Sequence, residues 1–262
     1  SHSQHFLDRL AVGYGWGGVW QEPRLEIASV FIDQFPEKGD LARQRVKKYG
    51  LKLYPDVENA LTLGTGKLAV DGVLLIAEHG VYPKNATGNT IYPKRRLFNE
   101  VQKGFRKTGQ SVPVFVDKHL ADNWKDSKWL YDTAAELKVP LMAGSSLPVL
   151  WRYPPVDVQR GAKLKEIVAV SYHTRDAYGY HALEMVQCLV ERRAGGETGG
   201  VDGPAAAASI GVPRAVDDEL VGAAALCGPA APRRRPRRAA IGEGLLRGGA
   251  CLLYTSDAAD EG

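Results

Sequence analysis

The sequence predicts an α/β protein built on a Rossmann-like, doubly wound parallel sheet. Two observations carry this prediction. Strand-like and helix-like stretches alternate between residues 25 and 146, and the inner strand-like stretches are apolar at consecutive positions instead of at every second one. Continuous apolar strands are typical of a parallel sheet whose two faces are both covered by helices. Right-handed crossovers then give a doubly wound fold.

The expected elements follow one another along the first 146 residues. Phe6, Leu7 and Leu10 have helical spacing and predict a helix over 3–12, whereas the Gly-rich stretch 13–23 is expected to be a loop. Further strands are expected at 25–33, 51–56, 71–80, 112–118 and 139–146, and further helices at 41–50, 57–64, 93–109 and 126–138. Residues 1–150 are therefore expected to form one domain, which lacks the first strand of its fold.

The pattern changes after Pro148. A strand is expected at 165–173 and a helix at 180–193, which carries an apolar side and a polar side. We expect residues 151–199 to be the beginning of a second, α+β domain that is cut short.

Composition restricts the class of protein. The 262 residues carry a net charge of only +4, and no apolar stretch is long enough to span a bilayer, so neither nucleic acid nor a membrane is an expected partner. Cys188, Cys227 and Cys251 are too scattered for a zinc site or a disulfide framework, which fits the cytoplasm. Because residue 1 is not Met, we expect the natural amino end to be missing, and an export signal stays open.

The composition breaks at residue 200. Residues 200–262 contain no Lys and no Trp, and Tyr254 is their only aromatic residue. The end of the segment, CLLYTSDAADE, can be back-translated into a sequencing-library adaptor. We expect 200–262 to be a disordered tail that arises from a frameshift into adaptor and buries little core; a natural disordered basic tail is the alternative.

Polar side chains gather where the expected strands end. Asp33 ends one strand, Glu78 and His79 end another, and Asp117, Lys118 and His119 end a third. Ligands of doubly wound sheets bind outside the carboxyl ends of the strands, so we expect these residues to border a ligand site. Lys94, Arg95 and Arg96 begin a helix instead and read as a solvated face, with a bound anion as the alternative.

Several stretches together resemble the glucose–fructose oxidoreductase/inositol dehydrogenase (Gfo/Idh/MocA) family over roughly residues 25–193. LEIASVFID resembles the family's second strand, DGVLLIAEHGVYP resembles a later strand, and VPVFVDKHLADNW resembles the stretch around its Glu-Lys-Pro motif. YGYHALEMVQCLV resembles its Gly-x-His-x-x-Asp helix start. The family's first strand and its Gly-x-Gly-x-x-Gly turn have no counterpart here.

The resemblance implies an NAD(P)-dependent oxidoreductase of sugars or polyols. Lys118 matches the motif lysine and His181 the catalytic histidine, whereas Asp117, His119 and Glu184 replace the family's Glu, Pro and Asp. The acid expected four residues before His181 is Ala177 here, with Asp176 one position away. A carbohydrate-like substrate is the implied partner, and a homo-oligomer is open for the full-length protein.

Roles follow from the chemistry. Oxidation of an alcohol requires a base for the hydroxyl proton, a task that Lys118 and His181 could share. An acid at Asp33 would hold the adenosine ribose and favour NAD over NADP. The other expected cofactor contacts are Glu78, His79 and Asp117, and the expected substrate contacts are His119, Tyr82, Asp176 and Glu184.

Each assignment has a plainer alternative. Lys118 could be a surface lysine at a turn, His181 a solvated helix-start residue, and Asp33 a turn residue before Pro36. For the whole chain, the alternative is a non-catalytic binding or structural protein on a degenerate Rossmann-like domain.

Overall fold

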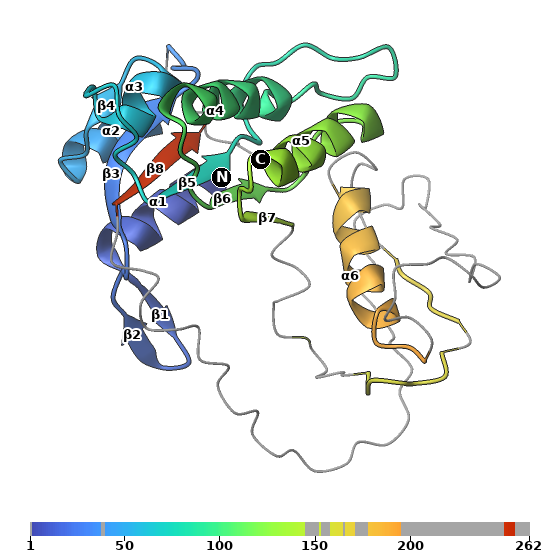
Figure 1. Cartoon of the computed structure of the whole chain (residues 1–262). Helices are drawn as coiled ribbons and strands as arrows, with labels where there is room; N and C mark the ends of the chain where they lie inside the picture. Colours follow the sequence, from blue (N-terminus) through green and yellow to red (C-terminus); the bar gives the residue numbers. More distant parts are fainter. Residues whose placement is uncertain are drawn as a thin grey trace. The chain divides into compact units, whose positions relative to one another are not determined.

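The computed structural model describes residues 2–37, 40–144, 152, 158–164, 166–170, 178–194 and 249–254. The chain divides into two compact units (Figure 1), one formed by Ser1–Gly144 with Ala239–Gly262 and the other by Ser145–Arg238. Each unit is considered by itself.

The first unit is built on a six-stranded, all-parallel sheet, which confirms the predicted fold class. Its strand order is β4-β3-β8-β5-β6-β7. The strands are β3 (Glu26–Ile32), β4 (Leu53–Tyr54), β5 (Gly72–Ile76), β6 (Val114–Asp117), β7 (Leu141–Gly144) and β8 (Gly249–Tyr254). This is the order of the dinucleotide-binding doubly wound fold, with β8 in the position of the first strand.

Strand β8 overturns part of the expectation for the tail. It pairs in parallel with both β3 and β5, so that Leu253 lies opposite Phe31 on one side and Leu75 on the other. The side chains of Cys251 and Leu253 are fully buried. The prediction that 200–262 is disordered and buries little core is therefore wrong for Gly249–Tyr254, because composition averaged over a long segment conceals a short apolar strand. Residues 195–248 and 255–262 lie outside the described part of the chain.

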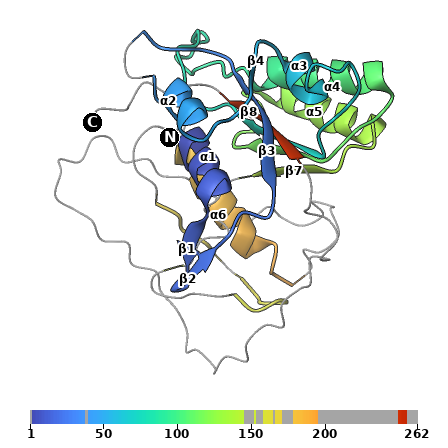
Figure 2. The same ribbon diagram turned by 90° about the vertical axis from the view of Figure 1, so that its left-hand side faces the viewer.

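Helices cover both faces of this sheet, as the apolar strands predicted. Figure 2 shows α1 (His2–Val12) and α2 (Leu41–Lys48) on one side of it, and α3 (Val57–Thr62), α4 (Lys94–Thr108) and α5 (Trp124–Glu136) on the other. In β5, Val73 and Leu75 join the core under α3 to α5, whereas Leu74 and Ile76 join the core under α1 and α2. Side chains that alternate along β5 therefore point into two apolar cores, one on each face of the sheet.

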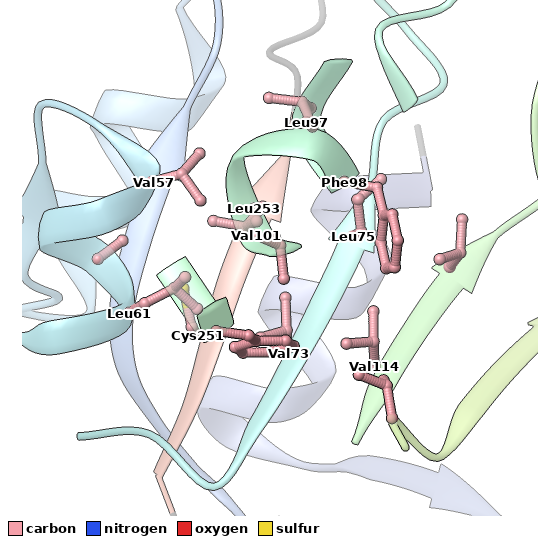
Figure 3. Packing of buried hydrophobic residues seen from close by; sticks show 14 of the residues in the cluster. Val57, Leu61, Val73, Leu75, Leu97, Phe98, Val101, Val114, Cys251 and Leu253 are labelled. Carbon is pink, nitrogen blue, oxygen red and sulfur yellow. The ribbon is translucent and has the colours of Figure 1, made fainter. Parts of the chain in front are cut away.

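The larger core lies where α3 and α4 cross the central strands (Figure 3). Leu61 of α3 and Val101 of α4 pack with Val73, Cys251 and Leu253 in one buried cluster. Burial of each such side chain contributes about 1.5–3 kcal/mol. Gly104 lets α4 approach α3 closely, since a Cβ there would lie 2.7 Å from Leu61 Cδ1.

The stretch expected to be a loop at 13–23 is instead a hairpin. Strands β1 (Tyr14–Trp16) and β2 (Val19–Gln21) pair antiparallel across Gly17 and Gly18. Both glycines have positive φ, at 58° and 77°, as a tight two-residue hairpin turn requires. The Gly-Gly pair was the overlooked signal.

Polar side chains fix the helix starts near the sheet. Asp40, Asp56 and Asn123 each accept a hydrogen bond from a backbone N–H in the first turn of α2, α3 and α5. Gly50, expected to stop a helix, has φ 63° just beyond α2. The expected helix positions are confirmed to within a few residues.

In the second unit, the expected helix is present as α6 (Tyr180–Val190). Residues 166–170 form no strand, so the prediction for 165–173 is wrong where the chain is described. No helix among the described residues is long and apolar enough to cross a membrane.

Candidate functional site

The carboxyl ends of β5 and β6 lie side by side. Val73 is paired with Val114 and Leu75 with Val116, so both strands leave the sheet at the same edge. Glu78 follows β5 after one further residue, and Asp117 ends β6 directly before Lys118. The prediction that these two polar segments are neighbours is confirmed by contacts between them.

A buried ion pair links the two segments. Lys118 Nζ donates a hydrogen bond to Glu78 Oε1. Lys118 is only 2% exposed and Glu78 only 8%. Removing both charges from water is costly, and the pair offsets that cost only while both partners are present. Lys118 is therefore not a surface lysine.

His2, the first residue of α1, completes the cluster. Its Nδ1 lies 2.7 Å from Asp117 Oδ2 and 2.9 Å from Glu78 Oε2. Hydrogen bonds to Asp117 and Glu78 raise the pKa of His2 to about 9. Burial opposes ionisation of Glu78, but the hydrogen bonds and charges of His2 and Lys118 outweigh it and hold the pKa of Glu78 well below its usual value.

Lys94 supplies a second buried ammonium. Its Nζ donates a hydrogen bond of 2.9 Å to the backbone carbonyl of Asp117, and the residue is fully buried. Burial lowers the pKa of Lys94 to about 8. The interpretation of Lys94 as part of a solvated face is wrong. We call His2, Glu78, Lys94, Asp117 and Lys118 the carboxyl-edge cluster.

Sequence reasoning overlooked two members of this cluster. Lys94 precedes Leu97, Phe98 and Val101 by three, four and seven residues, which places it on the buried side of α4, so its spacing was a usable signal. His2 offered no such signal, because only the docking of α1 against the sheet brings it to Glu78 and Asp117.

Asp33 lies at the same edge, just beyond β3. Its carboxylate accepts hydrogen bonds from Arg96 NH2 at 2.6 and 2.8 Å and from the Tyr82 hydroxyl at 2.7 Å. Nearby, a cavity of about 470 Å³ is lined in part by Phe31, Asp56, Asn59, Arg96 and Glu100. Asp33 and Tyr82, expected to contact cofactor and substrate, thus contact each other.

Two more predicted residues flank the carboxyl-edge cluster. The His79 ring centroid lies 6.2 Å from that of His2, and the His119 ring centroid lies 6.1 Å from that of Tyr92. Both side chains are half-buried.

The remaining predicted residues belong to the second unit. The His181 ring has Tyr178 and Tyr180 as aromatic neighbours, and Tyr180 donates a hydrogen bond of 2.7 Å to Glu184 Oε1. Asp176 lies outside the described residues. That His181 and Lys118 share one cleft stays a prediction.

Comparison of the chain with models of protein families, with curated proteins and with solved structures found no match. The class of protein is therefore defined by the fold and the site. The chain contains a Rossmann-like α/β unit with buried ionisable groups at the carboxyl ends of its strands. Such an edge can transfer protons between paired groups, and its His and carboxylate side chains are suited to holding a metal ion.

Proposed function

We propose that the chain is an NAD(P)-dependent oxidoreductase that acts on the CH–OH group of a sugar or polyol. The observation that carries this proposal is the contact between Lys118 and Glu78 at the carboxyl ends of two neighbouring parallel strands. That edge is where doubly wound sheets bind their ligands. The resemblance of the segment around Lys118 to the Glu-Lys-Pro motif of the Gfo/Idh/MocA family supports the same assignment.

In this proposal, His181 accepts the hydroxyl proton as the alcohol carbon is oxidised, and the ammonium group of Lys118 polarises the substrate oxygen. Glu78 forms an ion pair with Lys118 and would hold that ammonium group in position. The resemblance implies a catalytic role for both Lys118 and His181. NAD(P), when bound, supplies the hydride acceptor.

The residues of the chain fit NAD(P) at one end only. We propose that Asp33 and the cavity beside Arg96 would hold the adenosine part, although Asp33 is already paired with Arg96. In this fold a Gly-rich turn after the central strand holds the pyrophosphate, whereas Tyr254 is followed by Thr255, Ser256 and Asp257. These residues do not fit a pyrophosphate, so weak binding is expected, with NAD slightly preferred.

The first test measures cofactor binding. The chain is titrated with NADH and with NADPH, alongside a version in which a Gly-x-Gly-x-x-Gly turn directly follows β8. The added turn should increase affinity by supplying the missing backbone N–H groups. Identical titration curves for the two proteins would contradict the proposal.

The second test measures oxidation of a panel of polyols by the protein that carries the added turn. Lys118→Met combined with Glu78→Gln removes the ammonium group proposed to polarise the substrate oxygen, without leaving its ion-pair partner buried and charged, and should abolish turnover. Lys125→Met replaces an exposed lysine on α5 and should leave turnover unchanged. Turnover that survives the double substitution would remove Lys118 from the reaction.

A second candidate is a non-catalytic binding or structural protein. The observation in its favour is that Lys118 is 2% exposed and already paired with Glu78, as in a purely structural ion pair. The two candidate functions predict different results in the polyol oxidation test, because a structural protein would oxidise no polyol even when the phosphate-binding turn is supplied.

A further inference from the structure

We propose that His2, Glu78 and Asp117 form a binding site for one divalent transition-metal ion, with Zn²⁺ as the preferred ion. The three side chains come from α1, from the segment after β5 and from the end of β6. This proposal goes beyond the oxidoreductase proposal, with which it shares Glu78, because it concerns a ligand that NAD(P) chemistry does not require.

The geometry of the three side chains suits a metal ion. Each offers one ligand atom, and these atoms all lie within 4.8 Å of one another. His2 Nδ1 is 2.7 Å from Asp117 Oδ2 and 2.9 Å from Glu78 Oε2. A tetrahedral ion with metal–ligand bonds of about 2.0–2.2 Å needs ligand atoms separated by roughly 3.3–3.6 Å, so His2 Nδ1 and the two carboxylate oxygens would have to move apart by less than about 1 Å. Three protein ligands leave a coordination position for water or substrate.

Glu78 supplies an independent observation. Its Oε2 atom is buried, and its described contact is with His2 Nδ1, which also forms a hydrogen bond with Asp117 Oδ2. The whole residue is only 8% exposed. A single N–H of His2 cannot donate well to both carboxylate oxygens, whereas a metal ion in place of that proton would contact both of them.

The two neighbouring ammonium groups contact other atoms. Lys118 Nζ binds Glu78 Oε1, whereas His2 lies against Oε2, and Lys94 Nζ binds the backbone carbonyl of Asp117. Both hydrogen bonds fix the orientation of a proposed ligand, as outer partners of metal ligands do. The positive charges of Lys118 and Lys94 also weaken the binding of any ion that the site would hold by electrostatic attraction alone. We therefore expect affinity to decrease from Zn²⁺ to Mn²⁺ to Mg²⁺, following the preference for imidazole.

The experiment is a calorimetric titration of the full chain, without an affinity tag and stripped with a chelator, using Zn²⁺, Mn²⁺ and Mg²⁺ in turn. One Zn²⁺ should bind per chain. His2→Ala, Glu78→Gln and Asp117→Asn should each weaken Zn²⁺ binding by at least about tenfold. His5→Ala is the matched control, because His5 is an exposed histidine on the same helix, and it should leave Zn²⁺ affinity unchanged.

A second measurement guards against misfolded variants. Zn²⁺ should raise the melting temperature of the wild type and of His5→Ala, but not that of the three ligand variants, each first shown by circular dichroism to be folded. His2 is half-buried at a helix start, so His2→Ala is the variant best suited to this comparison. Three results would overturn the proposal: no Zn²⁺ binding by the wild type, an equal loss in His5→Ala, or a loss confined to His2→Ala.

Discussion

At the scale of single residues, the carboxyl-edge cluster places several charged side chains where they are almost fully buried from solvent. Glu78, Asp117, Lys94 and Lys118 are all buried, and two carboxylates face two ammonium groups. Each charge tolerates burial because another member of the cluster contacts it. The cluster is therefore a place where a single substitution has a large effect on stability and a paired substitution has a small one.

The Glu78–Lys118 pair gives the first prediction. Glu78→Gln or Lys118→Met alone should lower the free energy of unfolding by about 3–5 kcal/mol, because each leaves the opposite charge buried without its partner. The double variant should recover most of that loss. Urea unfolding of the four proteins measures the coupling. Additive losses in the double variant would mean that the two side chains do not form a pair in solution.

At the scale of elements, one carboxylate of α1 connects that helix to α2. Asp8 accepts hydrogen bonds from Arg45 Nε at 2.9 Å, from Arg45 NH2 at 3.0 Å and from the Tyr49 hydroxyl at 2.9 Å. Arg45 belongs to α2, and Tyr49 directly follows that helix. Because α1 carries His2 at its other end, these bonds also help to position the carboxyl-edge cluster.

The second prediction concerns the pH dependence of this contact. Burial opposes ionisation of Asp8, but the hydrogen bonds from Arg45 and Tyr49 outweigh it and lower the pKa of Asp8 below 3.8. A depressed pKa means that the contact stabilises the fold above about pH 4 and that the stabilisation is lost as the pH falls below that value. Asp8→Asn should therefore lower the melting temperature at pH 7 and have little effect near pH 3. An equal effect at both pH values would contradict this assignment.

The third prediction concerns Cys251 of β8. Burial raises the pKa of its thiol to about 12, so the reactive thiolate is scarce in the folded protein. In a Cys188→Ser/Cys227→Ser background, iodoacetamide should modify Cys251 rapidly in denaturant and very slowly without it. Because the folded pKa exceeds the ordinary value of 9.0, the thiol contributes its full stabilisation below pH 9 and loses it as the pH rises toward 12. Rapid native alkylation would show that β8 is not in the sheet.

Elements differ in how far the sequence reveals them. Apolar runs such as 71–80 and 112–118 predicted β5 and β6, because a strand buried on both faces needs apolar residues at successive positions. The neighbouring positions of Glu78 and Lys118 followed from the same topology. The position of β8 could not be predicted from the sequence, because no local pattern indicates which distant strands a short apolar stretch will pair with. His2 depends in the same way on where α1 docks.

At the scale of the whole molecule, the sheet depends on β8 to join its two halves. β3 and β4 lie on one side of β8, and β5, β6 and β7 lie on the other. Within the described residues, β3 pairs with β4 and β8, and β5 pairs with β6 and β8. Stability of the whole sheet should therefore respond strongly to changes in this one strand.

The fourth prediction tests this dependence. Leu253→Ala removes a fully buried side chain from β8 and should lower the free energy of unfolding by about 2–5 kcal/mol. Leu53→Ala is the matched control, because Leu53 lies on the edge strand β4 and is 39% exposed, so its cost should stay near 0.5 kcal/mol or less, roughly that of a surface change. Thermal and urea unfolding compare the two variants. Equal losses of unfolding free energy in the two variants would show that β8 matters no more to the stability of the sheet than the edge strand β4 does.

The position of β8 also has a consequence for biosynthesis. Gly249 donates its N–H to Asp71, which precedes it by 178 residues in the chain. At about 5–20 residues per second, roughly 10–35 s of translation separate those two residues. Throughout that time the nascent chain presents the open edges of β3 and β5 to the crowded surroundings of the ribosome, where unpaired edges promote aggregation. A chaperone that shields those edges would therefore determine how much of the newly made chain reaches the native state.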